Sequence, residues 1–384
     1  MNFIKRFSLM IGLLWVGNLW SQGTFTPTIA DLSFPRTLLD ANQIETVRAS
    51  LNDSFKITLY ERIWERAHDA IPEDNTTPAN RTRRGIIARE AAFILLMDRK
   101  WVDSELVELS DTEREWLIER ILFLLRTLNA EVETQAGWLF FDTWQFRSKE
   151  LIHYLIAYDL LKGTGLVHPD LAEAQDALQT FAGNLHQRMV DDYINPITGL
   201  KNLRFFFYNP NNHGVMSAAA IGLAAIVLGD LDSEQPNYQP QNWINTAMWN
   251  LDYVLWRADG LIPRVSEPDL LAGYAEGPSY FWYGFQNAFA FFRALWNYLP
   301  DGTYPYTFDG DSRSIPHPWY DQRYHRLYEW MNRIRMPNGM SPTIHDTPHG
   351  FSTAITALSG WPQYNLPNPG LSYTSAWMAS QYLA

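Results

Sequence analysis

The residues best suited to chemistry form three short clusters, and the first stands directly before an apolar segment. It reads Tyr208-Asn209-Pro210-Asn211-Asn212-His213-Gly214. Asn212 is a suitable helix N-cap, because an asparagine side chain accepts a hydrogen bond from a backbone N–H. Capping accounts for one asparagine and leaves Asn211 and His213 unexplained. Amides, an imidazole and the positive end of a helix together predict a site for a carboxylate.

The second cluster follows Asp259-Gly260 and reads Tyr274-Ala275-Glu276-Gly277-Pro278-Ser279-Tyr280-Phe281-Trp282-Tyr283. In a helix that begins at Glu276, the side chains of Glu276, Tyr280 and Tyr283 share one face. Such an aromatic stripe usually packs in a core. A tyrosine beside Glu-Gly-Pro at the head of a helix also fits an acid or base that meets a ligand.

The third cluster runs from Met336 to Gly350 and contains His345-Asp346, which is either an oriented imidazole or simple turn chemistry. Gln145 and Arg147 stand near the start of another predicted helix; two residues apart, they point to different sides, so at most one faces a cleft. Arg204, with Arg257 and Arg264, adds positive charge in or beside the long loops.

Other familiar chemistries lack their signals in this sequence. No two histidines stand four apart within a predicted helix, and there is no calcium loop, phosphate-binding loop, dinucleotide motif or Gly-x-Ser-x-Gly elbow. Cysteine is absent, which excludes disulfides, thiolate zinc sites and cysteine nucleophiles. We therefore expect neither a metal nor a cofactor.

The composition is that of a chain with a large core. Of 384 residues, 46% are hydrophobic and 19% are charged; the 16 tryptophans suit either helix packing or the apolar faces of sugars. The formal charge is −12, or −14 without Lys5 and Arg6, which argues against nucleic acid as a partner. An anionic ligand remains compatible, because a cleft can be locally basic on an acidic protein.

The first residues have the pattern of a signal peptide. Lys5 and Arg6 precede an apolar run from Phe7 to Trp20, and Ser21-Gln22-Gly23 follows. We expect residues 1–22 to be removed and the protein to be exported to a bacterial periplasm or beyond. The run is short for a membrane span and no other stretch is long enough, so stable membrane insertion is not expected.

Helical spacing of apolar residues dominates the rest of the chain and predicts an all-α fold. Residues 213–229 are apolar on every side and should be buried, whereas 111–129 should form an amphipathic outer helix. Buried and outer helices in alternation predict an incomplete (α/α)n toroid of antiparallel helix pairs over 23–335. Strands are scarce, and Phe205–Tyr208 is interpreted as an extended loop margin. The predicted helices are 40–51, 54–71, 83–100, 111–129, 145–162, 168–191, 213–229, 240–257, 276–298, 317–335 and 352–359.

Taken together, the three clusters resemble the alginate lyase and heparinase II/III-like polysaccharide lyases. The resemblance rests on Asn-Asn-His before an apolar helix, Glu-Gly-Pro-x-Tyr-x-x-Tyr after an Asp-Gly turn, and Met-Pro-Asn-Gly followed by His-Asp. It implies a helical toroid and then a β-sandwich, to which residues 336–384 would lead. It also implies cleavage of a uronic-acid polysaccharide by β-elimination, without a metal in the chemistry.

The resemblance also implies roles for individual residues. Asn212 and His213 would hold the C5 carboxylate, and Tyr280 would be the general acid and also a candidate base. His213 and His345 are the other candidate bases, and Tyr274 and Tyr283 are substitutes for Tyr280. The residues expected to bind substrate are Gln145, Arg147, Arg204, Asn211, Tyr274, Glu276 and Tyr283.

Two other functions fit the same residues. A glycoside hydrolase on the same fold would use two carboxylates, for which Glu276 and Asp142 are the candidates. A glycan-binding protein would keep an aromatic cleft and tolerate the loss of Tyr280 or His213. Dependence on a uronate favours the lyase, and activity on neutral glycans favours the hydrolase.

Overall fold

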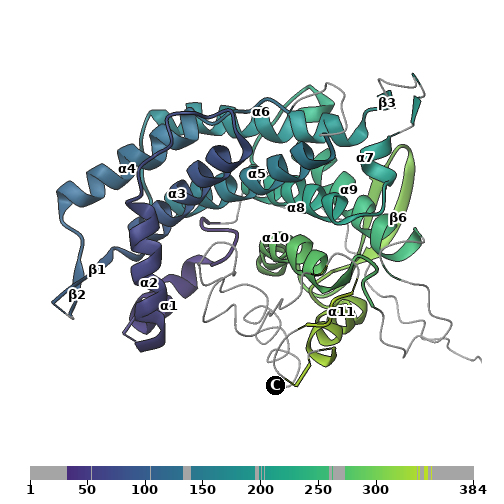
Figure 1. Cartoon of the computed structure of the whole chain (residues 1–384). Helices are drawn as coiled ribbons and strands as arrows, with labels where there is room; N and C mark the ends of the chain where they lie inside the picture. The colour runs from purple at the N-terminus through teal and green to yellow at the C-terminus, as the bar shows by residue number, and fades with distance from the viewer. Residues whose placement is uncertain are drawn as a thin grey trace, which may run out of the picture.

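Helices make up most of the chain in this computed structural model, together with three small antiparallel strand pairs (Figure 1). This confirms the all-α class. In the part of the chain that is described, no helix is both long and apolar enough to cross a membrane. The predicted signal peptide and the predicted helix at 352–359 lie outside the described residues. The structure describes residues 33–52, 54–103, 105–132, 140–194, 199, 201–202, 204–258, 262, 273–334, 336–337, 341–344 and 347.

The helix bounds agree closely with those predicted from apolar spacing. The largest extensions at a helix start are in α3, which begins at Pro78 and not at 83, and in α5, which begins at Phe140 and not at 145. Thr77 caps α3 by accepting a hydrogen bond from the Asn80 N–H at 3.4 Å, and proline suits the first turn. The helices are α1 (Ile44–Ser50), α2 (Ser54–Ala67), α3 (Pro78–Met97), α4 (Asp111–Arg126), α5 (Phe140–Gly163), α6 (Asp170–Val190), α7 (Phe205–Tyr208), α8 (Asn212–Val227), α9 (Pro240–Leu251, continued by a π-helical turn, Asp252–Arg257), α10 (Gly277–Tyr298) and α11 (Gln322–Arg333).

Helices α3, α5 and α8 pack side by side and run in the same direction. Between α5 and α8, Trp144 meets His213, and one turn later the Ser148 and Ser217 hydroxyls are 2.8 Å apart. Both helices advance together from one contact to the next, so they are parallel. Between α3 and α5, Arg81 meets Glu150 and Gly85 meets His153 in the same order.

Helix α10 continues this series on the other side of α8. Gly284 lies against Asn212, and further along both helices Gly222 lies against Phe291. A Cβ on Gly222 would be 2.5 Å from the Phe291 ring, so glycine is required for this close approach. All residues of α8 from Gly214 to Val227 are buried, which confirms the prediction that this helix is surrounded.

Helices α4, α6 and α9 connect the members of this parallel series. In Figure 1, α4 and α6 lie above α3, α5 and α8. Helix α4 buries Leu117, Ile121 and Leu125 and exposes Trp116 and Phe123, as an outer amphipathic helix should. The three series members α3, α5 and α8 are therefore joined through helices of a second layer.

The strand pairs were not predicted. In the turn between β5 and β6, Asp309 and Gly310 have φ angles of 54° and 83°, which suits a two-residue Asp-Gly hairpin turn. The extended interpretation of Phe205–Tyr208 was wrong: the N–H groups of Phe207 and Tyr208 both donate to the Arg204 carbonyl, forming a helical turn. The strands are β1 (Arg99–Val102), β2 (Glu105–Glu108), β3 (Tyr193–Ile194), β4 (Lys201–Asn202), β5 (Thr303–Phe308) and β6 (Asp311–Pro316).

Candidate functional site

The two asparagines at the start of α8 have different roles from those predicted. Asn211, not Asn212, is the N-cap, and its Oδ1 accepts a hydrogen bond from the Gly214 N–H at 3.0 Å. Asn212 is the first residue of the helix, and only 2% of it is exposed. Because capping does not use its side chain, the amide of Asn212 is available for another contact.

Glu276, at the N-cap position of α10, makes that contact. Its Oε2 accepts a hydrogen bond from the Asn212 N–H at 2.9 Å, and both carboxylate oxygens lie 3.2 Å from Asn212 Nδ2. The Tyr274 hydroxyl donates to the same Oε2 at 3.2 Å. A carboxylate from within the protein therefore takes part of the anion site that the sequence predicts at this helix start.

Tyr274 acts in support of Glu276. It is buried, and burial raises the pKa of its hydroxyl well above the ordinary value, with the charge of Glu276 adding to the effect. A tyrosine with a raised pKa that already donates to a carboxylate is a poor base. Tyr274 is therefore less suited than Tyr280 to acid–base chemistry.

The start of α10 depends on a glycine with a left-handed backbone. Gly277 has a φ of 81°, and a Cβ at this position would clash with the Ile344 carbonyl. Thr347 also packs here, since its hydroxyl accepts a hydrogen bond from the Ser279 N–H at 3.2 Å. Residues 341–344 and 347 thus hold the first turn of α10 in place.

Tyr280 lies on the stripe of α10 that faces Asn212. Glu276 and Gly284 stand four residues before and after it, and both contact Asn212; a Cβ on Gly284 would be 3.5 Å from Asn212 Cβ. One helical turn advances about 5.4 Å. Tyr280 stands one turn before Gly284 on the same face of α10, so it lies towards the start of α8, and it is half-buried.

Helix α5 adds the third side of the site. The ring of Trp144 meets the ring of His213 edge to face, with centroids 5.5 Å apart. The Lys149 ammonium lies 4.9 Å from the centroid of the Tyr283 ring. The N-terminal half of α5 therefore contacts those of α8 and α10, and His213, Tyr283 and Lys149 are all half-buried.

Three other residues predicted to bind substrate are buried or have partners within the protein. Gln145 is buried, with 7% exposed. Arg147 is 2% exposed; it pairs with Glu150, donates to the Asn129 carbonyl and lies over the Phe181 ring, so its contacts are those of a core residue. Arg204 pairs with Asp309 in the β5–β6 turn at 2.7 and 3.0 Å, and so joins two loops.

Some candidates cannot be placed. His345, Asp259, Gly260 and Arg264 lie outside the described residues, and so does the side chain of Asp142. Lys149 was missed by the sequence analysis. Its signal was its spacing: it stands four residues after Gln145 and so continues that face of the helix.

Within the described ranges, no three acidic or histidine side chains are grouped closely enough to hold a metal ion. The sequence matches no protein-family model and no curated protein sequence.

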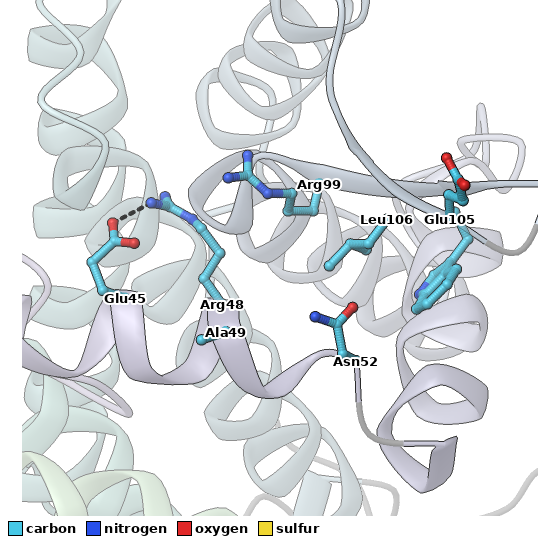
Figure 2. Close-up of a pocket in the computed structure, with 8 residues that line it drawn as sticks. Glu45, Arg48, Ala49, Asn52, Arg99, Glu105 and Leu106 are labelled. Carbon is cyan, nitrogen blue, oxygen red and sulfur yellow. Dashed lines mark hydrogen bonds and ion pairs between the residues drawn. The ribbon is translucent and has the colours of Figure 1, made fainter.

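A separate pocket of about 630 Å³ lies between α1 and the β1–β2 hairpin (Figure 2). Its most prominent cation, Arg48, donates to the carbonyls of Leu96 and Met97 at 2.8 Å and pairs with Glu45. Arg48 thus satisfies backbone carbonyls at the end of α3. None of the residues at the starts of α8 and α10 lines this pocket.

Proposed function

We propose that the protein is a polysaccharide lyase that cleaves a uronic-acid polymer by β-elimination at the starts of α8 and α10. The observation that carries the proposal is the contact of Asn212 with Glu276 and with the Gly284 position, because Tyr280 stands one turn before Gly284 on the same face of α10. A tyrosine, an amide and an imidazole at the starts of these two helices are the residue types that this reaction requires.

In the proposed reaction, the C5 carboxylate of the sugar is held by His213 and by the Asn212 amide. An amide NH₂ carries two hydrogens, and one remains for the substrate when the other points to Glu276. Stabilising the charge that grows on the carboxylate acidifies the C5 proton. Glu276 repels the carboxylate, so a protonated His213 is needed to offset it.

Bond changes in this step balance without water. A base removes the C5 proton, the C4–C5 double bond forms, and the bond from C4 to the glycosidic oxygen breaks. Tyr280 protonates the departing oxygen. Because a protonated His213 cannot take up a proton, Tyr280 is the candidate base within the described residues, and His345 stays a candidate from the sequence. The products are an unsaturated uronate and a shortened chain.

The parallel series α3, α5, α8 and α10, joined through second-layer helices, supports assignment to an incomplete (α/α) toroid. In such a fold the starts of the parallel helices lie at one end, where loops supply function. The hydrolase alternative is less favoured because Glu276 already accepts hydrogen bonds at both oxygens. To act as an acid, Glu276 would have to leave Asn212.

The test is the ultraviolet absorbance of the conjugated double bond during incubation with a panel of uronic-acid polysaccharides. We expect a rise that falls at least 100-fold in Tyr280→Phe, since general acid–base catalysis contributes about 10²- to 10⁴-fold. The control Tyr238→Phe, a tyrosine that packs against Gly183, should keep the activity. New reducing ends without a rise in absorbance would mean that the bond is hydrolysed, and the proposal would then change to a glycoside hydrolase.

A further inference from the structure

Basic side chains continue from the proposed site along α5 and α3 to α2. Lys149 lies between two rings, 4.9 Å from the centroid of Tyr283 and 5.8 Å from that of Phe146. One turn further along α5, His153 Nδ1 lies 3.0 Å from a guanidinium nitrogen of Arg89. Arg66 follows from α2. We call Arg66, Arg89 and Lys149 the basic wall; all three are half-buried.

The basic wall has fewer carboxylates than cations. Glu90 is shared by Arg89, at 2.5 Å, and Arg66, at 3.8 Å. The other carboxylate here, Glu150, is held in the core by two more cations, Arg81 and Arg147. Within the described residues, five cations therefore share two carboxylates, in a protein whose formal charge is −12.

His153 adds no charge of either sign to this balance. Arg89 donates to its Nδ1, which requires an unprotonated nitrogen. Burial lowers the pKa of His153 well below its ordinary value, and the charges of Arg89, Lys149 and Arg66 add to the effect. The imidazole is therefore neutral and serves to hold Arg89.

Excess positive charge in a partly buried place is costly unless an anion compensates it. Burial lowers the pKa of the Lys149 ammonium, and the charge of Glu150 only partly opposes this effect. The two rings beside Lys149 offer flat apolar faces of the kind that pack on sugars. Cation and ring side by side are suited to a sugar that carries an acidic group.

We infer that the basic wall binds a second acidic group of the polymer, so that the substrate carries carboxylates or sulfates on neighbouring sugars. The inference rests on the proposed function, because it extends the proposed site from Tyr283 towards Arg89. It restricts the substrate to polyanions and excludes polymers with isolated uronates. Lys149 and Arg89 would then set affinity and not the chemical step.

The test measures binding in a Tyr280→Phe background, in which turnover does not interfere. Calorimetry compares uronate oligomers (galacturonate, mannuronate and guluronate), a sulfated oligomer and a neutral oligomer of equal length, at low and high salt. Lys149→Met and Arg89→Gln should each weaken binding of the acidic oligomers about tenfold, the value expected for a lost hydrogen bond to a charged group. Their binding should also depend less on salt.

Matched variants separate this effect from unfolding. Arg83→Gln removes a charge from the same helix as Arg89, at a position where the side chain is 53% exposed and pairs with Asp69; it should bind as the parent does. Arg89→Lys keeps the charge and should retain most of the affinity. Thermal unfolding identifies any variant that has lost its fold.

Unchanged affinity in both Lys149→Met and Arg89→Gln would overturn the inference, and so would equal binding of neutral and acidic oligomers. Preference for the sulfated oligomer would identify sulfate as the second group. Weaker binding in these variants, with no unsaturated product from the unmodified protein, would keep the basic wall and reject the lyase. Unsaturated product from the unmodified protein, with unchanged binding in these variants, would keep the lyase and reject the basic wall.

Discussion

At the scale of single residues, the contact between Glu276 and Asn212 orients the amide that the proposed chemistry requires. Glu276→Gln replaces a charged acceptor with an amide, which can present only one oxygen. A hydrogen bond to a charged group is worth about 1.5–3 kcal/mol, so we expect kcat to fall about 10- to 100-fold. Initial rates of double-bond formation measure this, with Glu329→Gln on the exposed side of α11 as control. Unchanged kcat would mean that Asn212 needs no positioning.

Glu150 offers a test that does not depend on function. Arg81 and Arg147 both bind it in the core, so Glu150→Gln would leave two buried guanidinium groups without a carboxylate. We expect the free energy of unfolding to fall by about 3–5 kcal/mol. Urea unfolding measures this loss. Glu173→Gln, on the surface beside Arg126, should change stability by less than about 1 kcal/mol; an equally small effect at Glu150 would contradict the buried-pair interpretation.

The sequence predicts residue types at this scale better than it predicts their partners. Asn211, Asn212 and His213 were all named as site residues, but the cap was assigned to the wrong asparagine. Either could cap, and the choice depends on Glu276, which is 64 positions away in the chain. The spacing of Lys149 from Gln145 indicates which face of the helix it shares, but its contact with Tyr283, on another helix, shows in no local pattern.

At the scale of elements, apolar spacing was enough to place the helices. Helix α8 is the clearest case, because a helix without a polar side has to be buried on all sides. The β5–β6 hairpin was missed although Asp309-Gly310 is a known turn signal. Each flanking strand contains a proline. Tyr304, Tyr306 and Phe308 alternate in β5, but Ile315 is the one large apolar residue of β6, so the period-two pattern did not cover both strands.

Close packing of α8 on α10 depends on the absence of a side chain at Gly222. Gly222→Ala would place a Cβ 2.5 Å from the Phe291 ring. Alanine favours helices over glycine by about 1 kcal/mol, but overpacking a core costs about 1–3 kcal/mol. We therefore expect a net loss in the free energy of unfolding, measured in urea. The double variant Gly222→Ala/Phe291→Leu should be more stable than the sum of the two single effects; strict additivity would contradict contact between these positions.

At the scale of the whole molecule, the sequence indicates neither the order of helices in space nor their direction. The parallel series follows from pairs such as Ser148 with Ser217 and Gly222 with Phe291, which are about 70 residues apart. Such contacts fix the neighbours and the direction of each helix. The class of the fold was therefore predictable, while the contacts of Asn212 with Glu276 and of Lys149 with Tyr283 needed the structure.

Buried histidines make the stability of the whole molecule depend on pH. Burial lowers the pKa of His186 and of His317 to about 4, and the Trp319 N–H donates to His317 Nδ1, which favours the neutral ring. Unfolding restores the ordinary pKa of about 6.5, so the unfolded chain binds more protons between pH 6.5 and 4. Stability therefore falls as the pH falls through this window.

Asp159 acts in the opposite direction. Burial raises its pKa to about 6, although Thr37 and the Arg36 N–H donate to it. The folded state thus binds an extra proton at Asp159 below pH 6, which stabilises the fold on acidification. At pH 5 this gain is about 1 kcal/mol, against a loss of about 2 kcal/mol from each of the two histidines. The histidines outweigh it, and His153, whose pKa burial also lowers, adds to the loss, so the fold should be less stable at pH 5 than at pH 7.5 by at least about 2 kcal/mol.

His317→Asn isolates one of these contributions. The Asn Oδ1 can accept the Trp319 N–H in place of Nδ1, but it does not titrate. The difference in unfolding free energy between pH 7.5 and pH 5 should therefore shrink by about 2 kcal/mol in this variant. Urea unfolding at both pH values measures it, and comparison at pH 7.5 alone gives the cost of the substitution itself. If the pH difference is the same as in the unmodified protein, His317 is protonated in the folded state as readily as in the unfolded one, and burial is not what controls acid stability.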